Sequence, residues 1–99
     1  MRQGTAPRHT FTLPFDTSDV KKVRVLYKQN DGLKIRKTEK DVQMDGNKIV
    51  VTLTQEDTFC LNPNYETRIQ LRVLTKAGEP LVSDPFTVST EECFNKEVL

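Results

Sequence analysis

The sequence predicts an all-β protein, an antiparallel β-sandwich of about seven short strands in one domain spanning residues 1–99. Several short runs alternate apolar and polar side chains, which is typical of strands with one face buried and the other in water. Turn residues separate these runs at regular spacing. No long stretch has the periodicity of an amphipathic helix. Together these features favour two packed sheets over an α/β fold.

The stretch VKKVRVLYK, residues 20–28, is the clearest half-buried strand. Its apolar face carries Val23, Val25 and Tyr27, and its polar face carries Lys22, Arg24 and Lys28. Residues 30–32 then predict a tight hairpin, because asparagine, aspartate and glycine tolerate the positive φ that such a turn needs. The return strand LKIRKT is expected to direct Leu33 and Ile35 inward.

The other strands follow the same pattern. They are expected over residues 9–13, 47–54 and 65–75 and in the short segment DVQM, residues 41–44, which a second hairpin turn at Asp45 and Gly46 joins to the strand at 47–54. The run PLVSDPFTVS is expected to be an edge strand, because Pro80 and Pro85 have no N–H to donate to a neighbour. Residues 1–7 are expected to form an N-terminal arm.

The last residues, 89–99, break the alternation and are expected to form a tail. Ser89 or Thr90 followed by Glu91 and Glu92 is typical of the start of a short helix, with a capping hydroxyl and carboxylates in the first turn. A frayed tail is the alternative for the same residues.

The stretch LTQEDTFCLNPNY, residues 53–65, places adjacent carboxylates between two predicted strands. Thr54 can cap a single helical turn, with Asp57 at its third position bonding back to the Thr54 N–H. An acid–base pair of Glu56 and Asp57 is the competing hypothesis, but neighbouring side chains point apart and such pairs come from separate elements. The oxygen ligands of a calcium loop are also missing. The sequence therefore predicts a corner between the two sheets.

The letters EDTFCLNPNY resemble the connection that leads to the tyrosine corner of an immunoglobulin domain. Cys60 precedes Tyr65 instead of following it, and the chain has no tryptophan, which excludes an antibody-type domain. The expected fold class is therefore all-β, an immunoglobulin-like antiparallel β-sandwich, with a short C-terminal helix as an open alternative.

The chain offers little for catalysis, for a metal or for a cofactor. His9 is the one histidine and has no nucleophile near it in sequence, so a surface histidine is expected. Cys60 and Cys93 have neither zinc-site nor redox-pair spacing, and we expect free, partly buried thiols, with one disulfide as the alternative. The sequence thus predicts a non-enzymatic protein without metal or cofactor.

Charge and hydropathy limit the partners. Fifteen basic and fourteen acidic residues leave a formal charge of +1, which gives no general attraction to nucleic acid. No apolar run approaches the roughly 20 residues that cross a bilayer, and the N-terminus lacks the apolar segment of a secretory signal. We therefore expect a protein made in the cytoplasm, without nucleic acid or membrane as a partner.

Two surfaces are candidates for binding. The first is a basic set on neighbouring strands, Lys34, Arg36, Arg68 and Arg72. It is either a patch for nucleic acid or acidic glycans or a solvated face that protects the sheet edge, and the latter is favoured because no aromatic residues lie between these positions. The second is apolar and lies in the tail, at Phe94, Val98 and Leu99. The first strand, from Arg8 to Leu13, is the candidate pairing edge, and packing within the chain is the alternative for both tail and edge.

Four segments carry a resemblance over nearly the whole length. They are HTFTLPFDTSDVKKVRVLYKQND, NKIVVTLTQEDTF, IQLRVLTKAGEPLVSD and the ending EVL. The chain resembles a group of short uncharacterised proteins encoded in phages and prophages of Gram-positive gut bacteria. More loosely, its layout is similar to the N-terminal β-sandwich domain of phage baseplate upper proteins.

The resemblance implies a small virion or tail-associated module that binds other phage or virion proteins or forms a homo-oligomer, and that is assembled into the particle after synthesis. A binding module for a small ligand or a cell-surface glycan is the alternative function. That alternative requires exposed aromatic side chains, and Tyr27 and Tyr65 are its candidates.

Overall fold

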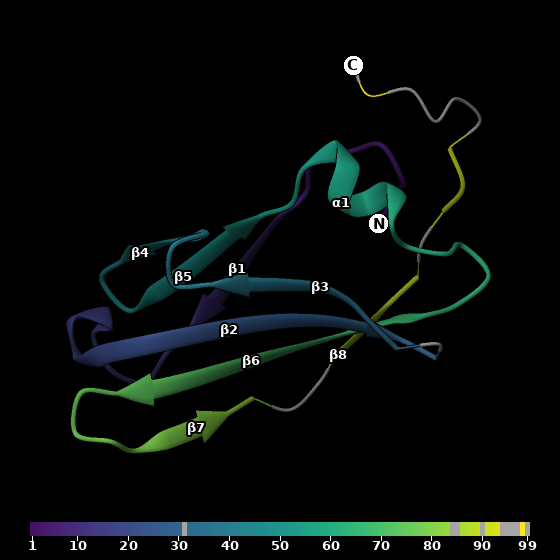
Figure 1. Cartoon of the computed structure of the whole chain (residues 1–99). Helices are drawn as coiled ribbons and strands as arrows, with labels where there is room; N and C mark the ends of the chain where they lie inside the picture. The colour runs from purple at the N-terminus through teal and green to yellow at the C-terminus, as the bar shows by residue number, and fades with distance from the viewer. Residues whose placement is uncertain (31, 84–85, 90, 94–97, 99) are drawn as a thin grey trace.

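Two antiparallel sheets form a sandwich in the computed structural model, which describes residues 1–30, 32–83, 86–89, 91–93 and 98 (Figure 1). The elements in chain order are β1 (Arg8–Thr12), the 3-10 helix η1 (Thr17–Asp19), β2 (Val20–Gln29), β3 (Gly32–Thr38), β4 (Val42–Asp45), β5 (Lys48–Thr52), α1 (Gln55–Phe59), β6 (Thr67–Thr75), β7 (Pro80–Val82) and β8 (Phe86–Val88). The smaller sheet has the order β1-β5-β4, and the larger has the order β3-β2-β6-β7, with β8 also paired to β6.

This strand order is immunoglobulin-like, as predicted. Strands β1, β5 and β4 take the places of B, E and D, while β3, β2, β6 and β7 take those of C′, C, F and G. An immunoglobulin domain would place its strand A on the free side of B. In the described part of the chain, β5 is the only strand that pairs with β1. The position of strand A is therefore vacant among the described residues.

The centre of the core is the pairing of β2 with β6. The register sets Val23 opposite Val73, Val25 opposite Leu71, and Tyr27 opposite Ile69, and all six are buried. They face Ile49, Val51 and Leu53 of the smaller sheet, which have no exposed surface. Burying side chains of this size stabilises the fold by about 1.5–3 kcal/mol each. The alternation predicted for residues 20–28 and 65–75 is confirmed.

The predicted corner is a capping box at α1. The Thr54 hydroxyl accepts from the Asp57 N–H at 3.1 Å, and the Asp57 carboxylate accepts from the Thr54 N–H at 2.9 Å. Lys37 of β3 also pairs with Asp57 at 2.8 Å. Burial raises the pKa of Asp57, but the hydrogen bonds from Lys37 and Thr54 outweigh it and hold the pKa below the usual aspartate value. The Asp57 carboxylate therefore serves the helix cap, as predicted.

The prediction for Leu33 is wrong. Ile35 is buried, but Leu33 is 54 % exposed. The register between β2 and β3 shifts between Tyr27 and Lys28, so that Lys34 is an extra residue without a counterpart in β2. Such a β-bulge interrupts the two-residue period and turns the next side chain to the opposite face.

The run predicted as one edge strand is divided into two short strands, β7 and β8, both paired to β6. Between them, Ser83 exchanges hydrogen bonds with Leu71, from the Ser83 N–H to the Leu71 oxygen and from the Leu71 N–H to the Ser83 hydroxyl, each at 2.9 Å. Pro80 lies in β7 at the sheet edge, as expected, and Pro85 lies outside the described residues.

The first seven residues pack against the α1 end of the sandwich. Gln3 is buried and donates to the Leu61 carbonyl at 2.7 Å, and the Gly4 N–H donates to the buried Thr58 hydroxyl at 2.9 Å. Gly4 has a φ of 78°, and a Cβ there would lie 3.0 Å from the Phe59 ring. A glycine is therefore required at this close approach.

The C-terminal stretch lies beside these first residues. Arg2 forms an isolated parallel bridge with Glu91, and the Cys93 N–H donates to Gln3 at 3.3 Å. Ser89 and residues 91–93 are not helical, and the rest of the stretch considered for a short helix is outside the described residues, except for Val98.

A buried amide holds the loop between α1 and β6. Gln29, at the end of β2, has no exposed surface. Its side chain donates to the Asn62 carbonyl at 2.9 Å and to the Thr67 hydroxyl at 3.1 Å, and it accepts from the Asn62 N–H at 2.9 Å. Both the oxygen and the nitrogen of this buried amide thus have partners in the loop and at the start of β6. These bonds fix the path by which the chain enters β6.

Replacing Gln29 by methionine is expected to lower the free energy of unfolding by about 2 kcal/mol or more, because both backbone groups of Asn62 lose their partner. Urea unfolding followed by circular dichroism measures the change. Gln43→Met, at an exposed position of β4, is the matched control and is expected to change stability by less than about 0.5 kcal/mol. Equal effects of the two substitutions would contradict the role given to Gln29.

Candidate functional site

The free edge of β1 presents backbone groups for pairing. The Leu13 N–H donates to the Asn47 carbonyl at 2.7 Å, and the Leu53 N–H donates to the Pro7 carbonyl at 2.9 Å. Both bonds continue the register of β1 and β5, so the odd-numbered residues of β1 direct their backbone groups to β5. The backbone N–H and C=O groups of Arg8, Thr10 and Thr12 consequently point away from the sheet. This edge can accept a further strand.

The two edges of the larger sheet are better protected. On the far side of the larger sheet, β3 carries the bulge at Lys34 together with Arg36 and Lys37. Strand β7 is only three residues long and begins with Pro80. Bulges, charges, proline and short length are the devices by which proteins prevent unwanted edge pairing. Strand β1 has a single charged residue, Arg8, and neither proline nor bulge.

An apolar groove runs beside this edge. It has a volume of about 440 Å³ and lies between residues 10–15 on one side and β7 on the other. Its floor includes Leu71 and Val73 of β6, and its walls include Phe15, Leu81 and Val82. The groove follows the gap between the B-like and G-like strands, which is where strand A of an immunoglobulin domain would lie. We refer to it as the β1–β7 groove.

His9 lies on the inner side of β1 and joins the two sheets. Its Nδ1 is 2.8 Å from the hydroxyl of the fully buried Tyr27 of β2, and the two ring centres are 5.7 Å apart. The expectation of a surface histidine is met only in part: His9 is half-buried, because the odd-numbered residues of β1 lie on the side of the core. Burial lowers the pKa of His9 and raises the pKa of Tyr27. The pair thus favours a neutral imidazole and a protonated phenol.

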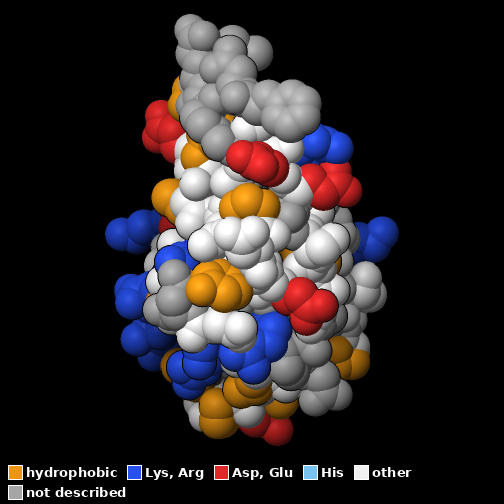
Figure 2. All heavy atoms as spheres, turned by 90° about the vertical axis from the view of Figure 1, so that its right-hand side faces the viewer, with side chains coloured by type: hydrophobic (Ala, Val, Ile, Leu, Met, Phe, Trp, Pro, Cys, Tyr) orange, Lys and Arg blue, Asp and Glu red, His pale blue; other side chains and the backbone are white. Residues whose placement is uncertain are grey.

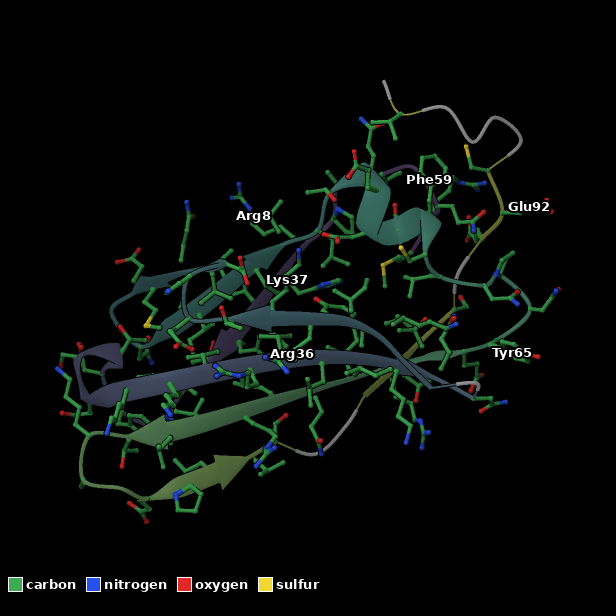
Figure 3. The ribbon with its side chains drawn as sticks, viewed as in Figure 1. Arg8, Arg36, Lys37, Phe59, Tyr65 and Glu92 are labelled. Carbon is green, nitrogen blue, oxygen red and sulfur yellow. The ribbon has the colours of Figure 1, made fainter. Side chains whose placement is uncertain are left out.

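The outer face of the larger sheet gathers six cations, called here the basic face. They are Lys22, Arg24, Lys28, Arg36, Arg68 and Arg72. The register of β3, β2 and β6 sets Arg36 opposite Leu26, Arg24 opposite Arg72, and Lys28 opposite Arg68. Lysine and arginine side chains gather along one side of the molecule in Figure 2, and Arg36 lies in front of the larger sheet in Figure 3.

Three of the four cations predicted for one sheet face, Arg36, Arg68 and Arg72, therefore share it. Lys34 is the extra residue of the bulge and has no cross-strand counterpart. Glu39 pairs with Arg24 and accepts from the Val23 N–H. In the described part of the chain, no carboxylate forms an ion pair with the other five members of the basic face.

The apolar tail residues are placed only in part. Val98 is exposed, whereas Phe94 and Leu99 lie outside the described residues. Both cysteines are free; Cys93 is half-buried, but Cys60 is exposed instead of partly buried as expected. The Cys60 thiol lies 3.4 Å from the Glu56 carbonyl at the end of α1.

Within the described ranges, no group of three or more histidine, cysteine, aspartate or glutamate side chains is placed to hold a metal ion. No helix formed by the described residues has the length and apolar character needed to cross a membrane. Comparison of the chain with protein-family models, with curated proteins and with solved structures finds no match. The candidate sites among the described residues are two surfaces, the β1 edge with its groove and the basic face.

From the sequence, the candidate edge and two of the three strands of the basic face could be predicted, but the groove could not. Those two strands were expected to be neighbours, whereas β2, with Lys22, Arg24 and Lys28, lies between them. Leu81 and Val82 follow Pro80, and this pattern predicts only an edge strand that is protected from pairing. Their position beside Phe15 depends on β1 and β7 lying at the same side of two different sheets. The sequence feature that could have indicated the groove is this pair of adjacent apolar residues, which follows a polar turn.

Lowering the pH is expected to destabilise the fold through His9. The pKa of His9 in the folded state lies below the ordinary value of 6.5. As the pH falls through this range, the unfolded chain therefore binds more protons than the folded chain, and protonation favours unfolding. The free energy of unfolding therefore decreases from about pH 7.5 to about pH 5.5, as urea titrations at the two pH values would measure. The decrease is expected to disappear in His9→Gln; an equal decrease in that variant would assign it to other groups.

Proposed function

We propose that this chain is a non-enzymatic interaction module of a phage or prophage particle, and that it binds a neighbouring virion protein by accepting a β-strand at β1. The observation that carries the proposal is the unpaired edge at Arg8, Thr10 and Thr12 beside an apolar groove. Main-chain hydrogen bonds supply affinity in such complexes, and side-chain pockets supply specificity. The phage assignment itself rests on the sequence resemblance described above.

The incoming strand takes the place of the vacant strand A. Its backbone bonds to the outward groups of β1, and alternate side chains enter the β1–β7 groove over Leu71 and Val73. Since the groove is apolar, the inserted side chains are aliphatic or aromatic. A second copy of the chain is the homo-oligomeric form of the same proposal, with its own segment as the donor.

The glycan-binding alternative receives less support from the tyrosines. Tyr27 is fully buried in the core and bonded to His9, so it presents no face to a sugar. Tyr65 is 36 % exposed and points away from the sheet in Figure 3. Tyr65 is therefore the one exposed tyrosine, and a single exposed tyrosine does not form the aromatic platform that glycan binding requires.

The particle assignment predicts that peptides of this chain occur in purified phage particles at a fixed copy number. The measurement is quantitative mass spectrometry of particles released after prophage induction of the source cell. Host cytoplasmic proteins of similar abundance serve as the contamination control. Recovery only in the cell lysate would contradict a place in the virion.

Thr10→Pro is expected to abolish strand addition while the domain stays folded. Proline at this position removes an N–H that points away from β5, so the existing sheet keeps its hydrogen bonds. Copy number in particles is expected to fall at least about tenfold, which corresponds to about 1.4 kcal/mol of binding free energy. Thr10→Val keeps the N–H and is the matched control. Wild-type incorporation of Thr10→Pro, with its fold verified by circular dichroism, would refute the β1 edge as the binding site.

A further inference from the structure

The basic face holds like charges directly opposite each other. Across β2 and β6, Arg24 faces Arg72 and Lys28 faces Arg68. Like charges opposed in this way destabilise a sheet. Glu39 relieves the first pair, but no described carboxylate pairs with Lys28 or Arg68. A face that only needed to be soluble would gain stability from mixed signs, so the arrangement points to an anionic partner.

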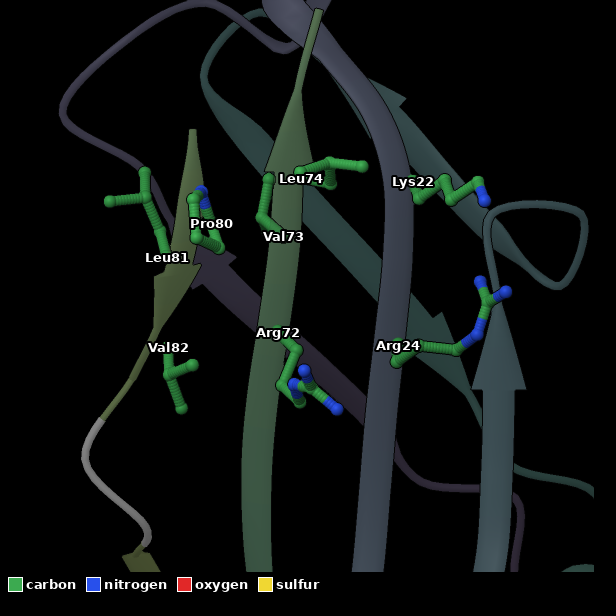
Figure 4. Close-up of a pocket in the computed structure, with 8 residues that line it drawn as sticks. All are labelled: Lys22, Arg24, Arg72, Val73, Leu74, Pro80, Leu81 and Val82. Atoms are coloured by element: carbon green, nitrogen blue, oxygen red, sulfur yellow. The ribbon is translucent and has the colours of Figure 1, made fainter. Parts of the chain in front are cut away.

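Two shallow hollows on the same face combine these cations with exposed apolar side chains. One, of about 220 Å³, is lined by Leu26, Lys28, Leu33, Arg68 and Gln70. The other, of about 230 Å³, lies between β2, β6 and β7 and is lined in part by Arg24, Arg72, Leu74, Pro80 and Val82 (Figure 4).

The two hollows include strongly exposed apolar side chains. Val82 and Leu33, which are 56 % and 54 % exposed, are the most exposed of the large apolar side chains described, and each lines one hollow. Leu33 owes its outward position to the β-bulge in β3. An apolar side chain beside an unpaired cation, repeated at both ends of one face, is typical of a protein-binding surface.

We propose that the basic face docks an acidic segment of a partner protein, with carboxylates between the paired cations and apolar side chains in the two hollows. Charge complementarity selects the acidic segment, because unpaired arginine and lysine bind carboxylates by charge-assisted hydrogen bonds. The two cation pairs are four residues apart along β2, about 13 Å. An extended segment lying along the strands therefore presents its carboxylates at that separation, four residues apart in its own chain.

The aliphatic character of the face favours protein over nucleic acid. Single-stranded nucleic acid is held by aromatic side chains on which bases stack, in addition to a basic groove. The apolar side chains that line the hollows are leucine, valine and proline, and none is aromatic. The cations of this surface lie on the larger sheet, away from the β1 edge, although Val82 lines both one hollow and the β1–β7 groove.

The test uses the whole chain and a fluorescently labelled peptide of about ten residues that contains glutamate and leucine in equal number, long enough to span both cation pairs. Fluorescence anisotropy at several salt concentrations measures binding. Lys28→Gln together with Arg68→Gln is expected to weaken binding about tenfold. Lys40→Gln together with Lys48→Gln, at exposed positions outside the face, is the matched control and is expected to stay within about twofold.

Removing a like-charge pair does not destabilise the sheet, so the midpoint of urea unfolding of the Lys28→Gln and Arg68→Gln variant is expected to equal or exceed that of the unsubstituted chain. A peptide with serine in place of leucine is expected to bind more weakly, since it leaves the hollows unfilled. Absence of salt-sensitive binding, equal affinities of the two double variants, or tighter binding of single-stranded DNA of the same charge would each overturn the proposal.

Discussion

The register between β2 and β6 is the constraint on which most of this molecule depends. Because side chains alternate strictly across a strand, one register decides both faces of the sheet. Setting Val25 opposite Leu71 buries the core, and it also sets Arg24 opposite Arg72 on the outer face. A slip by one residue would expose the core and bury the cations. The stability of the interior therefore maintains a charge arrangement that the outer face alone would not favour.

The two ends of the sandwich are completed by different interactions. At the α1 end, buried polar side chains bind backbone groups of distant segments: Gln29 holds the loop before β6, and Gln3 and Thr58 join the first residues to the corner. Such bonds give modest net stability but are costly to break once buried. Along the β1–β7 side, by contrast, the described residues leave the edge of one sheet and an apolar groove open.

An immunoglobulin-like sandwich in which the described residues form no strand A accounts for both proposed surfaces. The vacant strand A position leaves β1 available for a donor strand, while the bulge in β3 turns Leu33 outward among the cations of the larger sheet. The β1 edge belongs to the smaller sheet and the basic face to the larger one, and they use different interactions, main-chain hydrogen bonds at β1 and charge with aliphatic contacts on the basic face. A module of this kind can join two partners at once, which suits a component of a larger assembly.

The sequence by itself determined the local features. The alternation of residues 20–28 and 65–75, the hairpin turns and the capping box of Thr54 with Asp57 follow from spacing and residue type, since each depends on neighbours in the chain. Only the tertiary structure decided the orientation of Leu33, the contact of the half-buried His9 with Tyr27 and the groove beside β1. Each depends on contacts between strands far apart in sequence, where a bulge or the assignment of a strand to a sheet changes which side chains meet, and no local pattern records that choice.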